Sequence, residues 1–150
     1  AQMDIGTARE KQDEYGLAVK AYEVAADRYS DRKDVSADAL FKAGLAYHKQ
    51  ARTAEYDQNA AAQAIAAFTD FITLYPDDPR VSDAQTLISG MRYEQARGAY
   101  EIAKFYEKRK KYDGALIYYN EVLVKDPESS MAVLARLRID ELKRRLEQEN

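Results

Sequence analysis

The chain contains no cysteine, which excludes a disulfide framework and any cysteine-based metal or redox chemistry. Only three prolines and six glycines interrupt its 150 residues, so long helices can form. It has no run of about 18 apolar residues, the length that a membrane-spanning helix needs. The net charge of −3 argues against nucleic acid as the main partner.

The remaining composition is typical of a globular helical protein, with 46% hydrophobic and 33% charged residues. A chain of this length can form one continuous core, and we expect residues 1–150 to be one repeat domain. The sequence begins at Ala1 without an initiator methionine or a signal peptide. We therefore expect it to be a mature or trimmed segment.

Three stretches share one spacing: an alanine, an aromatic residue four positions later, and a proline or serine eight positions further on. The three sets are Ala18, Tyr22 and Ser30; Ala64, Phe68 and Pro76; and Ala115, Tyr119 and Pro127. This spacing resembles the second helix of a tetratricopeptide repeat, where the small residue lets two helices approach and the aromatic ring fills the gap. The pairs Ile5-Gly6, Ala43-Gly44 and Ile102-Ala103 resemble the Leu-Gly step of the first helix.

These signals predict an all-α, tetratricopeptide-like right-handed superhelix. Its three helical hairpins are expected at about residues 1–30, 36–76 and 80–127, with a lone terminal helix at about 130–147. The middle hairpin carries about eight inserted residues at 52–59. Ser36 and Asp78 are expected to cap helices. No proline interrupts residues 80–109, which predicts one long helix or two joined by a bend.

Two sets of large apolar residues carry packing predictions. In the third hairpin, residues 102, 106, 112 and 119 are expected to fill the space around the small helix contact. In the terminal helix, apolar residues cover two sides. We expect one side to pack on the third hairpin. We expect the other to be covered by a missing element, a partner or a second copy.

Residues 64–76 and 100–116, with the acidic turn and long helix between them, resemble the BamD-type lipoproteins of the bacterial outer-membrane β-barrel assembly machinery. The later stretch has the aromatic pair Phe105-Tyr106, then Lys108-Arg109, then Tyr112-x-x-Ala115, as that family does. The resemblance covers about residues 61–127. It implies a non-enzymatic periplasmic scaffold that is held at the outer membrane by a lipid anchor upstream of Ala1. The implied partners are the periplasmic domain of the barrel-forming subunit and unfolded outer-membrane proteins.

Two other interpretations stay open. The chain could be another cell-envelope or cytoplasmic tetratricopeptide adaptor that binds peptide segments, or the accessory domain of an enzyme. The upstream sequence would separate the three interpretations. It would carry a signal and a lipidated cysteine in a BamD-like lipoprotein, no signal in a cytoplasmic adaptor, and a catalytic domain in an enzyme.

Tetratricopeptide stacks usually bind ligands on the concave face that their first helices form. The repeat register predicts nine residues for this protein- or peptide-binding face: Phe41, Leu45, His48, Lys49, Arg97, Tyr100, Lys104, Glu107 and Lys108. Exposed aromatic side chains beside cations suit an extended peptide with acidic groups. The alternative is that the long helix covers this groove and that these residues only pack.

The sequence predicts no catalytic, cofactor-binding or metal site. His48 is the only histidine, no paired-ligand spacing accompanies it, and we expect it to face solvent. No phosphate-binding glycine loop or nucleophile motif occurs. The basic run at 108–111 could dock an acidic partner or phospholipid head groups, or could be a solvated turn.

Overall fold

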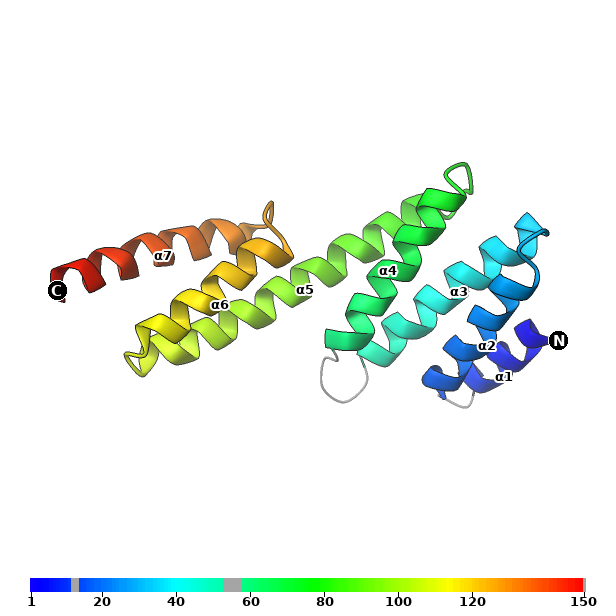
Figure 1. Ribbon diagram of the computed structural model, residues 1–150, viewed down its shortest axis with the longest axis horizontal. Helices are drawn as coiled ribbons and strands as arrows, with labels where there is room; N and C mark the ends of the chain where they lie inside the picture. Colours follow the sequence, from blue (N-terminus) through cyan, green and yellow to red (C-terminus); the bar gives the residue numbers. More distant parts are fainter. Residues whose placement is uncertain (12–13, 53–57, 150) are drawn as a thin grey trace. The chain divides into compact units, whose positions relative to one another are not determined.

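The computed structural model describes residues 1–11, 14–52 and 58–149, and every regular element in them is a helix (Figure 1). In chain order these are α1 (Gln2–Lys11), α2 (Tyr15–Arg28), α3 (Lys33–Ala51), α4 (Gln58–Leu74), α5 (Val81–Lys108), α6 (Tyr112–Lys125) and α7 (Ser130–Glu149). The predicted all-α, tetratricopeptide-like fold is confirmed. The long helix is also confirmed, because α5 runs for 28 residues without a break. Most of the predicted insertion, residues 53–57, lies outside the described residues.

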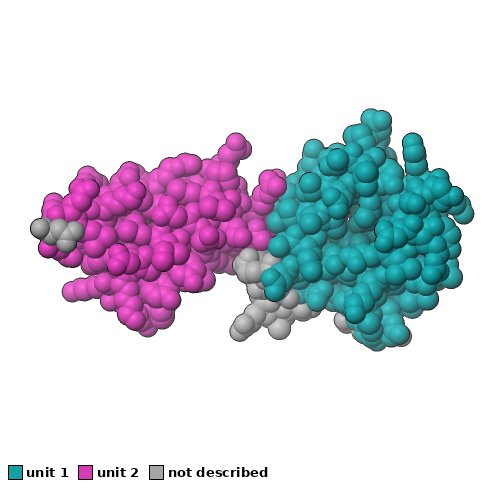
Figure 2. Space-filling view, in the orientation of Figure 1, with its two compact units in different colours: residues 1–88 teal, residues 89–150 magenta. Residues whose placement is uncertain are grey.

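The chain divides into two compact units, which Figure 2 shows in different colours. Unit 1 is Ala1–Ile88 and contains α1 to α4 with the first turns of α5. Unit 2 is Ser89–Asn150 and contains the rest of α5 with α6 and α7. Each unit has hydrophobic clusters of its own, and the single repeat domain over residues 1–150 stays a prediction.

In unit 1, each helix from α1 to α4 packs against the next one along the chain. The repeat positions explain how the helices approach so closely. A methyl group at Gly6 would overlap the ring of Tyr22, and one at Gly44 would lie 2.6 Å from the ring of Phe68. Both rings are fully buried, so glycine leaves the space that the aromatic side chain of the second helix fills.

In unit 2, the small residues Ala103 of α5 and Ala115 of α6 are fully buried beside the ring of Tyr119. Helix α7 adds Ala135, Ile139 and Leu142 to the same cluster, as expected for one of its two apolar sides. The prediction that Ile102 fills this contact is wrong, since its side chain is 44% exposed. Its neighbour Ala103 faces the cluster, and adjacent helical residues point about 100° apart.

Of the two predicted caps, only one is confirmed. The Asp78 carboxylate accepts the backbone N–H of Arg80 at 2.9 Å, immediately before α5 begins. The Ser36 prediction is wrong because α3 begins at Lys33, so Ser36 lies inside the helix. The buried Ser36 hydroxyl instead donates to the backbone carbonyl of Ala26 in α2, which ties α3 to the end of the preceding helix.

Candidate functional site

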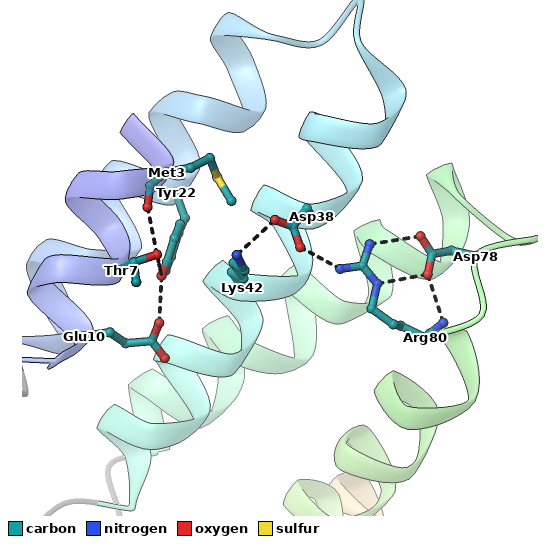
Figure 3. A network of polar contacts seen from close by, with 8 residues as sticks. All are labelled: Met3, Thr7, Glu10, Tyr22, Asp38, Lys42, Asp78 and Arg80. Atoms are coloured by element: carbon teal, nitrogen blue, oxygen red, sulfur yellow. Dashed lines mark hydrogen bonds and ion pairs between the residues drawn. The ribbon is translucent and has the colours of Figure 1, made fainter. Parts of the chain in front are cut away.

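A three-residue ionic clasp ties the first three helices of unit 1 together. The Tyr22 hydroxyl on α2 donates to the Glu10 carboxylate on α1 at 2.7 Å, which Figure 3 shows from close by. The Lys49 ammonium on α3 donates to the other oxygen of the same carboxylate. Lys49, predicted as a peptide-binding cation, is therefore engaged within the fold.

Unit 2 contains a second clasp of the same design. The Tyr119 hydroxyl on α6 donates to Glu107 on α5 at 2.8 Å, across the same twelve-residue spacing as in the first clasp. Arg138 of α7 donates to both oxygens of Glu107, at 3.0 and 2.7 Å. This bidentate geometry is the stronger form of a charge-assisted hydrogen bond. Glu107, also predicted to bind a peptide, thus joins three helices of its own unit.

The clasps hold their carboxylates ionised at neutral pH. Burial alone would raise the pKa of Glu107, but the hydrogen bonds from Arg138 and Tyr119 outweigh it and hold the pKa below its ordinary value of 4.5. The pKa of Glu10 is lowered in the same way, against burial, by Lys49 and Tyr22. The phenols respond in the opposite direction: burial and the nearby carboxylate raise the pKa of Tyr22 to about 12.

The middle hairpin replaces the clasp with apolar packing. Four residues after the small residue of its first helix, this hairpin has His48 where the other hairpins have glutamate. Four residues after the small residue of its second helix, it has Phe68 where they have tyrosine. His48 is half-buried, so the prediction that it faces solvent is wrong. Burial lowers its pKa, and so do the positive charges of Arg52 and Lys49. These effects favour a neutral imidazole at this position.

Phe41 does not offer the exposed aromatic ring that the register predicted. It is buried, and its ring centre lies 5.3 Å from that of Phe71. The Arg80 guanidinium covers both rings, at 5.0 and 5.4 Å from their centres. Arg80 is held there by hydrogen bonds to Asp78 at 3.0 Å and to Asp38 at 2.8 Å (Figure 3). This arrangement closes the predicted aromatic site in unit 1.

The groove between the first helices α1 and α3 of unit 1 also differs in charge from the predicted site. Its volume is about 340 Å³, and its lining residues are Met3, Asp4, Thr7, Asp34, Val35, Asp38 and Lys42. Three carboxylates and one lysine do not suit the acidic peptide that the sequence predicted. The half-buried Leu45 does not line this groove.

The remaining predicted residues lie along one side of α5 in unit 2, here called the α5 stripe: the exposed Arg97, Lys104 and Lys108, and the half-buried Tyr100. Their spacing of three and four residues places them on one side of the helix. The Lys104 ammonium lies 5.6 Å from the centre of the Tyr100 ring, which packs edge-on against Tyr119. Among the described residues, Arg97 and Lys104 pair only with exposed glutamate side chains of the same helix, Glu94 and Glu101. Such pairs stabilise a helix little, so both cations are available to a partner.

The structure also exposes apolar side chains that the register does not predict for the site. Phe105 is 50% exposed on the side of α5 that carries Ile102, and the Arg109 guanidinium lies 3.5 Å from the centre of its ring. A helical wheel drawn from Ala103 would have placed both apolar residues outside the core. Helix α7 exposes a further apolar set, which agrees with the unpartnered side expected from its sequence: Val133, Leu134 and Leu137.

The turn after α5 has an unusual backbone conformation. Lys110 has φ 59°, in the left-handed region that favours glycine. The N–H of Lys111 bonds to the carbonyl of Tyr106 at 3.0 Å, and that of Lys110 bonds to the carbonyl of Glu107 at 2.9 Å. This pair of bonds is the Schellman ending of a helix, whose left-handed position is usually glycine.

We therefore expect Lys110→Gly to raise the free energy of unfolding by about 1 kcal/mol. Relief of the left-handed conformation gains about 1–2 kcal/mol, and the extra freedom of unfolded glycine removes part of that gain. Urea unfolding followed by circular dichroism measures the change. Lys111→Gly is the control because φ there is −91°, and it should give no gain. Equal effects from the two variants would contradict the prediction.

Helical hairpins closed by contacts between a small residue and an aromatic ring define a tetratricopeptide-type repeat protein. The described residues contain no cluster of three His, Asp or Glu side chains that could hold a metal ion. Within the same residues, no helix combines the length and apolar character that crossing a membrane requires.

The chain belongs to the YfiO family of outer membrane lipoproteins, whose sequence model matches residues 1–150. The resemblance to BamD-type lipoproteins is thereby confirmed, and it extends beyond the stretch at 61–127 that first indicated it. No curated protein matches the chain.

Proposed function

We propose that the chain is a non-enzymatic scaffold in outer-membrane protein assembly, located in the periplasm at the outer membrane. The family match supports a role at the outer membrane, and the repeat fold suits protein binding. The proposed partners are the periplasmic domain of the barrel-forming subunit and unfolded outer-membrane proteins.

The α5 stripe is the observation that carries this proposal. It combines an aromatic ring with cations whose present pairs lie on the exposed surface of one helix. Arginine and tyrosine are enriched among residues that dominate binding energy at protein interfaces. The clasp between Glu107 and Arg138 fixes α5 against α7, so the stripe is presented on a rigid support.

The test is a calorimetric titration of the chain with the periplasmic domain of the barrel-forming subunit from the same bacterium. We expect Arg97→Ala with Lys104→Ala to weaken binding about tenfold, since both cations are lost while alanine preserves the helix. An unfolded outer-membrane protein, kept in urea and diluted into the calorimeter cell, serves as a second titrant.

The matched control is Lys20→Ala with Lys125→Ala, which removes the same charge from exposed positions elsewhere. This control should bind like the unmodified chain, and both variants should keep the helical circular-dichroism signal. Unchanged affinity in the stripe variant, or an equal loss in the control, would contradict the assignment of the α5 stripe.

A further inference from the structure

The turn between α5 and α6 carries four consecutive cations, here called the basic turn: Lys108, Arg109, Lys110 and Lys111. All four are exposed. None of them forms an ion pair with any side chain in the described parts of the chain. This differs from Arg97, which has a glutamate partner. The basic turn is thus a local concentration of uncompensated positive charge on a chain whose net charge is −3.

The nearest acidic residues reduce this charge only in part. Glu107 is already neutralised by Arg138 in the clasp. Asp113 and Glu149 line a shallow opening of about 370 Å³ beside Lys110 and Lys111. Two carboxylates beside four cations leave the basic turn positively charged.

An exposed apolar surface adjoins the basic turn. Ile102 and Phe105 lie three residues apart on one side of α5 and are 44% and 50% exposed. The Arg109 guanidinium lies over the Phe105 ring at 3.5 Å from its centre, so a cation and an apolar ring form one unit. The half-buried ring of Tyr106 packs edge-on against Phe105 and supports it from the core side.

We propose that the basic turn and the adjoining side chains of Ile102 and Phe105 dock on an anionic phospholipid surface. The cations would contact lipid phosphates, and the two apolar side chains would enter the boundary between head groups and acyl chains. Long lysine side chains reach head groups while their methylene stems stay in the apolar layer. Exposed cations that form no ion pair within the described residues, beside a half-exposed ring, suit a fluid surface with many phosphates better than one partner with fixed carboxylates. This contact lies beyond the proposed protein-binding function.

The test is co-sedimentation of the folded chain with vesicles of phosphatidylcholine, alone or with about 30% phosphatidylglycerol. The chain should bind the anionic vesicles and not the neutral ones, and binding should fall as salt is raised. Lys110→Gln with Lys111→Gln should lower the partition coefficient about twenty-five-fold, because each cation near an anionic surface strengthens binding about fivefold. Phe105→Ser should lower it about tenfold through lost apolar burial.

The control, Lys20→Gln with Lys33→Gln, removes the same charge from exposed positions of unit 1 and should bind vesicles like the unmodified chain. Equal binding to neutral vesicles, full binding by the basic-turn variant, or an equal loss in the control would each overturn the proposal. If the basic-turn variant no longer binds the barrel-forming subunit but still binds the vesicles, the proposal is also overturned. That result would assign the turn to binding an acidic protein surface. Loss of vesicle binding with protein binding intact would support it.

Discussion

Replacing Gly44 with alanine is expected to lower the free energy of unfolding by about 2 kcal/mol, although alanine is the better helix former. The new methyl group would lie 2.6 Å from the Phe68 ring. That ring cannot move away easily because it is fully buried and packs against Phe41, with 5.6 Å between ring centres. Overpacking of about 3 kcal/mol outweighs a propensity gain of about 1 kcal/mol.

The same exchange at Gly90 is the matched control, with the opposite sign expected. Gly90 lies inside α5, and a methyl group there would meet nothing within 4 Å. Gly90→Ala should therefore raise the free energy of unfolding by about 1 kcal/mol. Urea unfolding followed by circular dichroism measures both variants. Stabilisation by Gly44→Ala would show that α3 and α4 do not approach as closely as the repeat pattern requires.

Removal of the unit 2 clasp by Glu107→Ala is expected to cost about 2 kcal/mol at neutral pH. The Arg138 guanidinium would lose its bidentate partner, and the Tyr119 hydroxyl would lose its acceptor. The loss is moderate because the Arg138 side chain is 37% exposed and water can replace part of the interaction. Glu101→Ala is the control, since its pair with Lys104 lies on the surface and should contribute less than about 0.5 kcal/mol.

The clasp also predicts a pH dependence. The pKa of folded Glu107 lies below its ordinary value of 4.5, so its contribution is fully present above that pH. Protonation removes the contribution as the pH falls through the folded pKa. Urea unfolding should be measured at several pH values between neutral and acidic. The free energies of unfolding of the unmodified chain and of Glu107→Ala should therefore converge below pH 4.5. A stability difference that stays constant down to strongly acidic pH would contradict the ionic character of the clasp.

Much of the fold could be predicted from the sequence because it depends on contacts within one hairpin. The spacing from Ala18 to Tyr22 and from Ala115 to Tyr119 indicates which residues meet between neighbouring helices, and all four are buried. The absence of proline from residues 80–109 likewise predicted α5, since helix continuity is a local property.

Whether the predicted site residues are free or engaged could not be predicted in this way, because it depends on partners far along the chain. Glu107 meets a cation 31 residues later, and Asp38 meets Arg80, 42 residues later. Spacing within one hairpin carries no signal for such pairs. The repeat register also assigns a face to each residue without saying what covers it, which is why Phe41 was expected to be exposed and is buried.

The most direct test of the proposed role in outer-membrane protein assembly is depletion of the native protein in the bacterium that encodes it. Folded β-barrel proteins of the outer membrane would be measured by their heat-modifiable mobility on gels. We expect the folded barrels to decline and unfolded precursors to accumulate, with rescue by the unmodified protein and weaker rescue by Arg97→Ala with Lys104→Ala. Unchanged levels of folded barrels after the protein has disappeared would contradict the proposed function.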